Sequence, residues 1–114
     1  MNQSTWQAFD IAELKQRVQG HEPRFFEFLG SGRLSGAIYR LPASATDLQG
    51  PHLEDEVYVV LEGEARLRID SAEQEVHPGM VLFIPADTRH AFVDIRRDLT
   101  LLALFSATAR PGRH

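Results

Sequence analysis

Two histidines stand where an imidazole can take part in chemistry. His52 precedes the apolar run 57–60, and His90 opens a second run at 90–95. A histidine at the start of a strand is either a structural residue or a metal ligand. The other three histidines lie beside loop, turn or terminal residues, and we expect them at the surface: His21, His77 and His114.

Three carboxylates follow His52 within four residues: Glu54, Asp55 and Glu56. Because side chains alternate along a strand, His52 and Glu56 share a face with Tyr58. On a buried face an unpaired Glu56 carboxylate costs several kcal/mol, and a metal ion shared with two imidazoles removes that cost. The segment is therefore either part of a metal site formed by His52, Glu56 and His90, or a solvated acidic loop.

A metal site of this kind requires a bend in the chain. Four residues of straight strand span roughly 13 Å, whereas metal–ligand bonds are about 2.0–2.2 Å long. If His52 and Glu56 bind one ion, the backbone must bend or bulge between Leu53 and Asp55.

Composition indicates one globular domain. The chain has 114 residues, of which 43% are hydrophobic and 25% are charged. A chain of this length can bury one hydrophobic core but is too short for two domains. It has no cysteine, so disulfides and thiolate metal ligands are excluded. Any metal must be held by imidazole and carboxylate groups.

Several partner classes are not expected. A net charge of −4 and scattered arginines argue against nucleic acid. The longest apolar run, 99–107, is about half of a membrane span. The first four residues lack the basic and apolar character of a signal peptide, so we expect a cytoplasmic location.

The first 20 residues are predicted to form a helical extension that lies across a face or edge of a β-domain at 21–114. A helix is expected over 6–18, capped by Asp10 with Glu13 completing a capping box, and ended near Gly20. Its apolar residues fall near one face: Ile11, Leu14 and Val18.

The remaining chain reads as short strands separated by turn residues. Glu62-Gly63 is typical of a hairpin, and Pro78-Gly79 suits a type II turn. The pattern predicts an all-β antiparallel sandwich or barrel and disfavours a doubly wound α/β fold. The expected strands are 25–29, 34–41, 57–61, 65–69, 75–77, 80–84, 90–95 and 99–105.

Two segments resemble the paired motifs of the cupins. Residues 50–63, with His52, Glu56 and then Gly63, resemble the first motif. Residues 79–90, from Gly79 through Pro85 to His90, resemble the second. The chain is similar to small single-domain bacterial cupins, and the resemblance implies a double-stranded β-helix, or jelly-roll barrel, with a short N-terminal helix.

The sequence departs from the cupin pattern at three positions. Gly50 stands where the first motif usually has another histidine, and Glu54 is an alternative to that ligand. Asp87 replaces a glycine, as a turn residue able to adopt an unusual backbone conformation. Asp94 replaces an asparagine, either supporting the site or serving as a plain strand residue.

The resemblance implies a 2-His-1-carboxylate set with open coordination positions, which favours a catalytic metal. Fe(II), Zn²⁺, Mn²⁺ and Ni²⁺ all suit it, although some cupins bind none. One hypothesis is an enzyme of the dioxygenase, isomerase or lyase type acting on a small organic molecule, with Tyr58 or Tyr39 offering a phenol. The other is a non-catalytic barrel that binds or stores a small molecule.

Self-association is a further expectation. Cupin-like barrels often pair into homodimers, and the apolar segment 25–28 is a candidate edge for such pairing. The alternative is that these phenylalanines fill the core.

Overall fold

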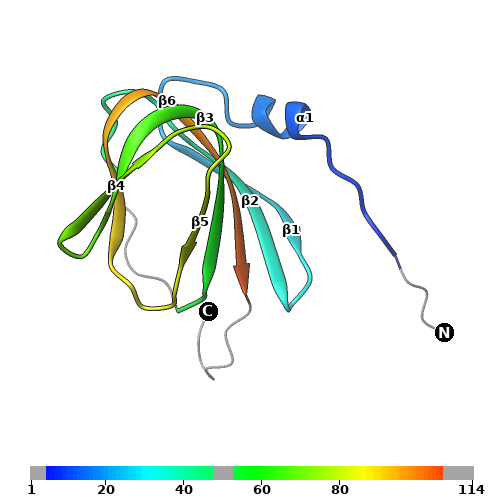
Figure 1. Cartoon of the computed structure of the whole chain (residues 1–114). Helices are drawn as coiled ribbons and strands as arrows, with labels where there is room; N and C mark the ends of the chain where they lie inside the picture. The colour runs from blue at the N-terminus through cyan, green and yellow to red at the C-terminus, as the bar shows by residue number, and fades with distance from the viewer. Residues whose placement is uncertain (1–4, 48–52, 107–114) are drawn as a thin grey trace.

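Two long strands, β3 (Glu56–Ile69) and β6 (His90–Ser106), dominate the structure. The computed structural model describes residues 5–47 and 53–106 (Figure 1). β3 and β6 pair antiparallel from Glu56↔Phe105 at one end of the ladder to Ile69↔His90 at the other. β2, β4 and β5 pair directly with this bent pair, and β1 is joined to it through β2.

The shorter strands extend the two halves of the ladder into two sheets. β1 (Arg24–Gly30) pairs with β2 (Leu34–Leu41), which pairs with the end of β6. β5 (Val81–Ile84) pairs with the start of β3, and β4 (Ala72–Val76) pairs with its end. All these pairings are antiparallel, which confirms the predicted all-β barrel class.

The main core lies between the two sheets. The side chains that alternate inward from both sheets form one buried cluster, and Tyr58 and Phe92 are its largest fully buried members. A second cluster lies on the outer face of the larger sheet, where Leu14 and Val18 pack against Ile38. The N-terminal segment therefore covers one face of the barrel, as expected.

The helix is shorter than predicted. α1 spans Ile11–Gln16, with Asp10 accepting a hydrogen bond from the Ala12 N–H at 2.8 Å. It ends at Gln16 rather than near Gly20, because Arg17 already serves as the C-cap. Ile11 is 43% exposed, so its expected place on the buried face was wrong. A helix this short is stabilised mainly by packing against the sheet, because its intrinsic helix propensity is too weak to hold it.

The predicted hairpin at Glu62-Gly63 is also wrong, because β3 runs through it without reversing. Gly63 has φ +103°, and the register with β6 shifts on both sides of it. The residues left unpaired at these register shifts form β-bulges, which bend the ladder without reversing the direction of β3. The two strands expected on either side of Gly63 are therefore one strand, and 90–95 and 99–105 merge into β6 in the same way.

The predicted type II turn at Pro78-Gly79 is confirmed. The Met80 N–H donates to the His77 carbonyl at 3.3 Å, and Gly79 has φ +92°. This turn delivers the chain from β4 to β5.

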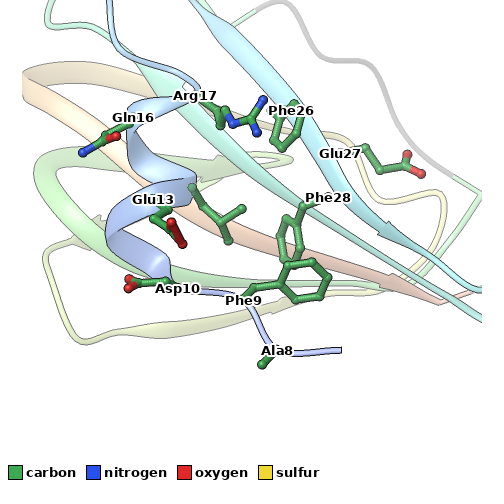
Figure 2. A pocket seen from close by; sticks show the side chains of 10 residues that line it. Ala8, Phe9, Asp10, Glu13, Gln16, Arg17, Phe26, Glu27 and Phe28 are labelled. Carbon is green, nitrogen blue, oxygen red and sulfur yellow. The ribbon is translucent and has the colours of Figure 1, made fainter. Parts of the chain in front are cut away.

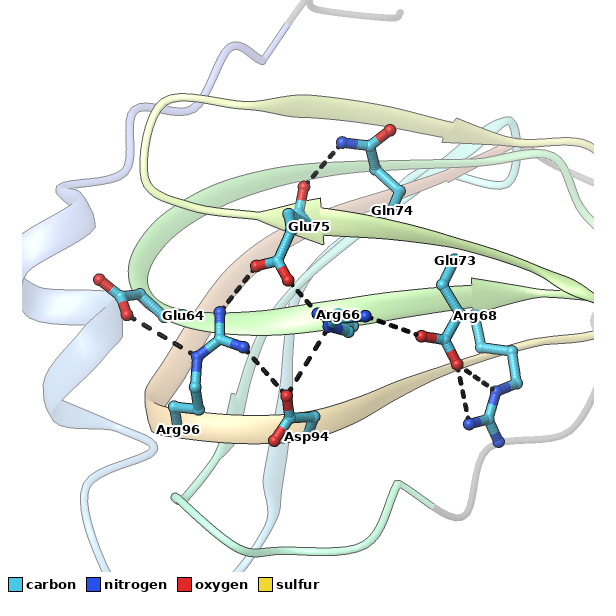
Figure 3. A network of polar contacts seen from close by, with 8 residues as sticks. All are labelled: Glu64, Arg66, Arg68, Glu73, Gln74, Glu75, Asp94 and Arg96. Carbon is cyan, nitrogen blue, oxygen red and sulfur yellow. Dashed lines mark hydrogen bonds and ion pairs between the residues drawn. The ribbon is translucent and has the colours of Figure 1, made fainter.

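A network of ion pairs ties the smaller sheet together on its exposed surface (Figure 3). Arg66 on β3 contacts Glu75 on β4 at 2.8 Å and Asp94 on β6 at 3.8 Å. Arg96 on β6 contacts Glu75 at 2.7 Å and Asp94 at 2.9 Å. Each pair is worth little in water, but the network links three strands.

Within the described residues, no helix is both long and apolar enough to cross a membrane.

We expect Gly63→Ala to destabilise the protein by about 3 kcal/mol, since it adds backbone strain and a collision. A Cβ there would meet the Asp98 carbonyl oxygen and lie 2.6 Å from Leu99 Cα. Gly79→Ala is the matched control, because φ is also positive there but no atom lies within 4 Å of the added carbon. Urea denaturation measures both; equal costs would contradict the assigned collision.

Acid should weaken the network before the core. Arg68 and then Arg66 hold the pKa of Glu73 below its ordinary 4.5, and Arg96 does the same for the pKa of Glu75. A lowered folded-state pKa means that this stabilisation is complete above about pH 4.5 and is lost as the pH falls through the folded-state value.

The melting temperature should therefore fall less on acidification in a Glu73→Gln, Glu75→Gln double variant than in the wild type. High salt should shrink that difference because it screens exposed charges. Glu22→Gln, outside the network, is the control, and an acid response identical in all three proteins would contradict the interpretation.

Candidate functional site

Glu56 and His90 meet in the interior although they belong to opposite ends of the β3–β6 ladder. Each is the first residue of its strand, and their side chains are both 1% exposed. Glu56 Oε1 lies 3.1 Å from His90 Nε2. The bend in the ladder thus joins two residues that the predicted site required to be close.

The orientation of the His90 ring follows from its other nitrogen. Nδ1 lies 2.9 Å from the Thr88 carbonyl oxygen, an acceptor to which the ring must donate. Nδ1 therefore carries the proton, and Nε2 of the neutral ring presents its lone pair toward Glu56. A carbonyl that fixes the tautomer in this way is the usual support of a metal-binding histidine.

The Glu56 carboxylate is the most unusual polar group of the interior. It lies within ion-pair distance of His90, yet neither of its oxygens receives a hydrogen bond from the described part of the chain. Buried carboxylates are normally hydrogen-bonded or bound to a cation. Its surroundings match a ligand group better than a structural one.

Tyr58 stands beside this pair. Its hydroxyl lies 3.3 Å from His90 Nε2, and its ring packs edge-on against Phe92 at a centroid distance of 5.1 Å. Ala37 and Ala103 occupy the same row of the sheet, and such small side chains leave room for the ring. The phenol is fully buried and faces the imidazole.

Tyr39, the other phenol predicted from the sequence, contacts a carboxylate that sequence reasoning missed. Its hydroxyl donates to Asp47 Oδ1 at 3.0 Å, while the Phe92 N–H donates to Asp47 Oδ2 at 2.9 Å. Asp47 thus ties its loop to β6 two residues beyond His90. It lies in a polar loop, and its partners are 8 and 45 residues away in the sequence, so no local signal marks it.

Burial and neighbouring charges shift the pKa values of two of these groups, His90 and Tyr39. Burial alone would lower the pKa of His90, but the Glu56 carboxylate, the Thr88 carbonyl and Asp47 raise it above its ordinary value. Burial, followed by the charge of Asp47 and its hydrogen bond, raises the pKa of Tyr39 well above its usual range. Tyr39 therefore stays a neutral hydrogen-bond donor.

The first predicted ligand, His52, lies outside the described residues, as does Gly50. The required bend is present next to it, because the chain bends at Leu53 and Glu54 before β3 begins. Asp55 does not face the pair: its carboxylate accepts from the Ala86 N–H at 2.9 Å, and its N–H donates to Ser106 Oγ. It holds the ends of β5 and β6 against the start of β3.

Within residues 5–47 and 53–106, no group of three or more histidine and carboxylate side chains is arranged to hold a metal. Glu56 and His90 supply two donors of the kind that divalent metals bind, 3.1 Å apart. The donor chemistry therefore fits a metal ion, with further ligands still required.

A pocket of about 340 Å³ lies between β5 and the β3–β4 hairpin. Its lining is mainly apolar and includes Ile84 and Ile69, which are the cross-strand neighbours of Glu56 and His90. A larger groove of about 640 Å³ runs between α1 and β1 and contains none of the predicted site residues (Figure 2). The lining of the smaller pocket also contains none of the predicted site residues, but two of its members pair across the sheet with Glu56 and His90.

The residues 37–105 match the family model of the cupin domain. The chain belongs to the cupin family. This match covers more than half of the chain, including β2, β3, β5 and β6 and both members of the buried pair.

Relatives of this cupin agree on the fold. An uncharacterized protein of Streptomyces coelicolor is 35% identical over 99 residues, covering 87% of this chain and 94% of that protein. An RmlC-like cupin of Shewanella frigidimarina is 19% identical, with a TM-score of 0.73 over 96% of this chain and 97% of the other. The lyase DddQ of Ruegeria pomeroyi, which acts on DMSP, is 21% identical, with a TM-score of 0.72 over 80% of this chain and 50% of that one.

The departures of this cupin from the family motifs have structural explanations. Asp87 has φ +62°, as expected of a residue that replaces a glycine in a turn. Asp94 lies on the surface in the ion-pair network, so the idea that it supports the site was wrong. Its strand position points outward, away from the core. His21 and His77 are exposed, as predicted.

In this cupin we expect Asp47→Asn to cost more stability than Tyr39→Phe. The first change places an amide N–H₂ against one of two donors and weakens both buried hydrogen bonds, at roughly 1–3 kcal/mol. The second removes one hydroxyl and leaves the Phe92 N–H paired. Urea denaturation of both variants and their combination measures the coupling, and a larger loss for Tyr39→Phe would contradict the bridging role.

Proposed function

We propose that this cupin is a metal-dependent enzyme that acts on a small organic molecule, with Glu56 and His90 as two of the metal ligands. The supporting observation is the buried Glu56 carboxylate, which faces the Nε2 of His90 at 3.1 Å and receives no hydrogen bond from the described residues. His52, predicted from the sequence as the third ligand, completes the proposed set.

The buried pair requires a positive charge between its members. Nε2 of the neutral imidazole and the carboxylate oxygen are both acceptors, and two acceptors 3.1 Å apart repel each other. Either a proton on Nε2 or a metal ion removes the repulsion. The Thr88 carbonyl takes the Nδ1 proton in either case, so Nε2 is the nitrogen that can hold the proton or the metal ion.

The bound metal would supply Lewis-acid activation or, if it is redox-active, oxygen chemistry. The chain's own groups would orient the substrate around it. Tyr58 can donate its hydroxyl proton to a substrate oxygen, because this hydroxyl already lies within 3.3 Å of the proposed ligand His90. Tyr39, held by Asp47, keeps a second neutral phenol in place.

The pocket between β5 and the β3–β4 hairpin supports a small substrate, because its lining includes the cross-strand neighbours of Glu56 and His90. At about 340 Å³ it lies at the small end of ligand pockets, and its lining is mainly apolar. It therefore suits a small molecule whose polar group reaches the proposed metal while its carbon skeleton lies against the apolar wall. The lyase from Ruegeria pomeroyi supports an enzymatic use of this fold, without assigning its substrate to this chain.

Metal binding is tested by thermal stability, independently of activity. We expect Fe(II), Zn²⁺, Mn²⁺ or Ni²⁺ to raise the melting temperature of metal-free protein. At 100 times the dissociation constant the gain is about 2.7 kcal/mol. Glu56→Gln should remove most of this gain while leaving the metal-free protein at least as stable, because it deletes an uncompensated buried charge of similar shape.

His90→Ala and His52→Ala should also abolish the gain, and elemental analysis should show the loss of bound metal. His77→Ala, which changes an exposed histidine, is the matched control and should behave as the wild type. Metal content equal in the wild type and in Glu56→Gln would refute the proposed site. If metal binds but no reaction occurs with a panel of thiols, diketones, phenols and hydroxy-acids, the protein is a binding barrel.

A further inference from the structure

The pocket between β5 and the β3–β4 hairpin, here named the β4–β5 pocket, has an apolar wall. Leu67 and Ile69 of β3 and Leu82 and Ile84 of β5 line it. Among the described residues of this lining, Gln74 is the only polar side chain. An apolar pocket fixes the orientation of its ligand through the few polar groups placed in it. Gln74 is therefore the residue of this wall that can discriminate between ligands.

Gln74 belongs to the inner face of the smaller sheet, although β4 is an edge strand. The register aligns Gln74 with Leu67 on β3 and with Phe92 on β6, and both of these residues are 1% exposed. Its neighbours Glu73 and Glu75 join the ion-pair network on the opposite face. Figure 3 shows the Gln74 amide directed away from this network. Gln74 thus stands at the edge of the interior and is still exposed to solvent.

The next inward row on this face contains His90. Ile69 pairs with His90 across the sheet, and Ile69 lies two residues beyond Leu67, the partner of Gln74. Two strand spacings and two residue steps place the Cα atoms of Gln74 and His90 roughly 12 Å apart. Both side chains extend from the same face of the sheet. A ligand with a short carbon skeleton can therefore contact both of them.

The carboxamide of Gln74 offers a ligand an acceptor. Its Nε2 donates to the Glu75 carbonyl oxygen at 2.9 Å. The amide oxygen Oε1, with two lone pairs, is then the atom available to a ligand. A hydroxyl, an ammonium or an amide N–H can donate to it. A carboxylate, which is an acceptor, cannot.

We propose that Gln74 determines specificity by accepting a hydrogen bond from the far end of the substrate, whose near end meets the Glu56–His90 pair. This inference rests on the proposed function, in which the pair holds the metal. It narrows the substrate class to small molecules with three parts. These are a metal-binding oxygen group, a short apolar skeleton, and a hydrogen-bond donor at the other end.

Isothermal titration calorimetry of the Zn²⁺-loaded protein tests this role with two matched acids. They are hexanoate and the hydroxyhexanoate that carries its hydroxyl on the terminal carbon. We expect the hydroxy acid to bind about 3- to 10-fold more tightly, which corresponds to one added hydrogen bond. Gln74→Leu should remove this preference. Gln16→Leu, which changes an exposed glutamine on α1, is the matched control and should keep it.

Two further probes test the donor requirement. Adipate, with a carboxylate at each end, should bind the wild type less tightly than hydroxyhexanoate, because its far end brings a second acceptor to Oε1. Gln74→Glu should instead favour the aminohexanoate whose ammonium is on the terminal carbon, since a carboxylate at position 74 adds a charge-assisted hydrogen bond. Gln74 is exposed, so its variants should keep the circular dichroism spectrum of the wild type.

Equal affinities of the wild type for hexanoate and hydroxyhexanoate would overturn the proposal. So would a preference that survives Gln74→Leu, tighter binding of adipate, or no detectable binding of either acid. Glu56→Gln separates this proposal from the proposed function. If the pair holds the metal, that change should weaken both acids alike and leave their affinity ratio intact. Unchanged or tighter binding in Glu56→Gln, with the ratio still lost in Gln74→Leu, would refute the metal and uphold the role of Gln74.

Discussion

The bend in the β3–β6 ladder is the constraint on which the candidate site depends. The register pairs Glu56 with Phe105 and His90 with Ile69, so the two site residues begin at opposite ends of one antiparallel ladder. In a straight ladder, 13 residue steps would separate them by about 43 Å. The bend instead brings Glu56 Oε1 to 3.1 Å from His90 Nε2. The backbone near Gly63 and Asp98 therefore determines the geometry of a site formed from other residues.

This constraint explains what could be predicted from the sequence. His90 and Glu56 were identified because each precedes an apolar run and lies in a motif, and these are local signals. The bend at Leu53 and Glu54 lies in the segment where one was expected if His52 and Glu56 bind the same ion, an expectation drawn from strand rise and metal–ligand bond lengths. The bend at Gly63 was taken for a hairpin, because a glycine with positive φ serves both purposes and only the cross-strand register distinguishes them.

Asp47 shows where sequence reasoning ended. Its loop has ordinary turn composition, and its importance arises from two contacts, with the Tyr39 hydroxyl and the Phe92 N–H. The first partner lies on β2 and the second on β6, so the contact exists only after the barrel closes. Asp94 is the opposite case: its place in a motif suggested support for the site, but β6 breaks its alternation at Asp94, which has φ +50°. Asp94 therefore faces outward into the ion-pair network and the next residue, Ile95, is buried.

The two apolar faces of the larger sheet place different demands on the same strands. Inward positions such as Tyr58 and Glu56 are fully buried in the core and the site, while outward positions such as Val57 and Val59 are half-buried. Because the period along a strand is two, the inner face can hold an uncompensated carboxylate without altering the outer face.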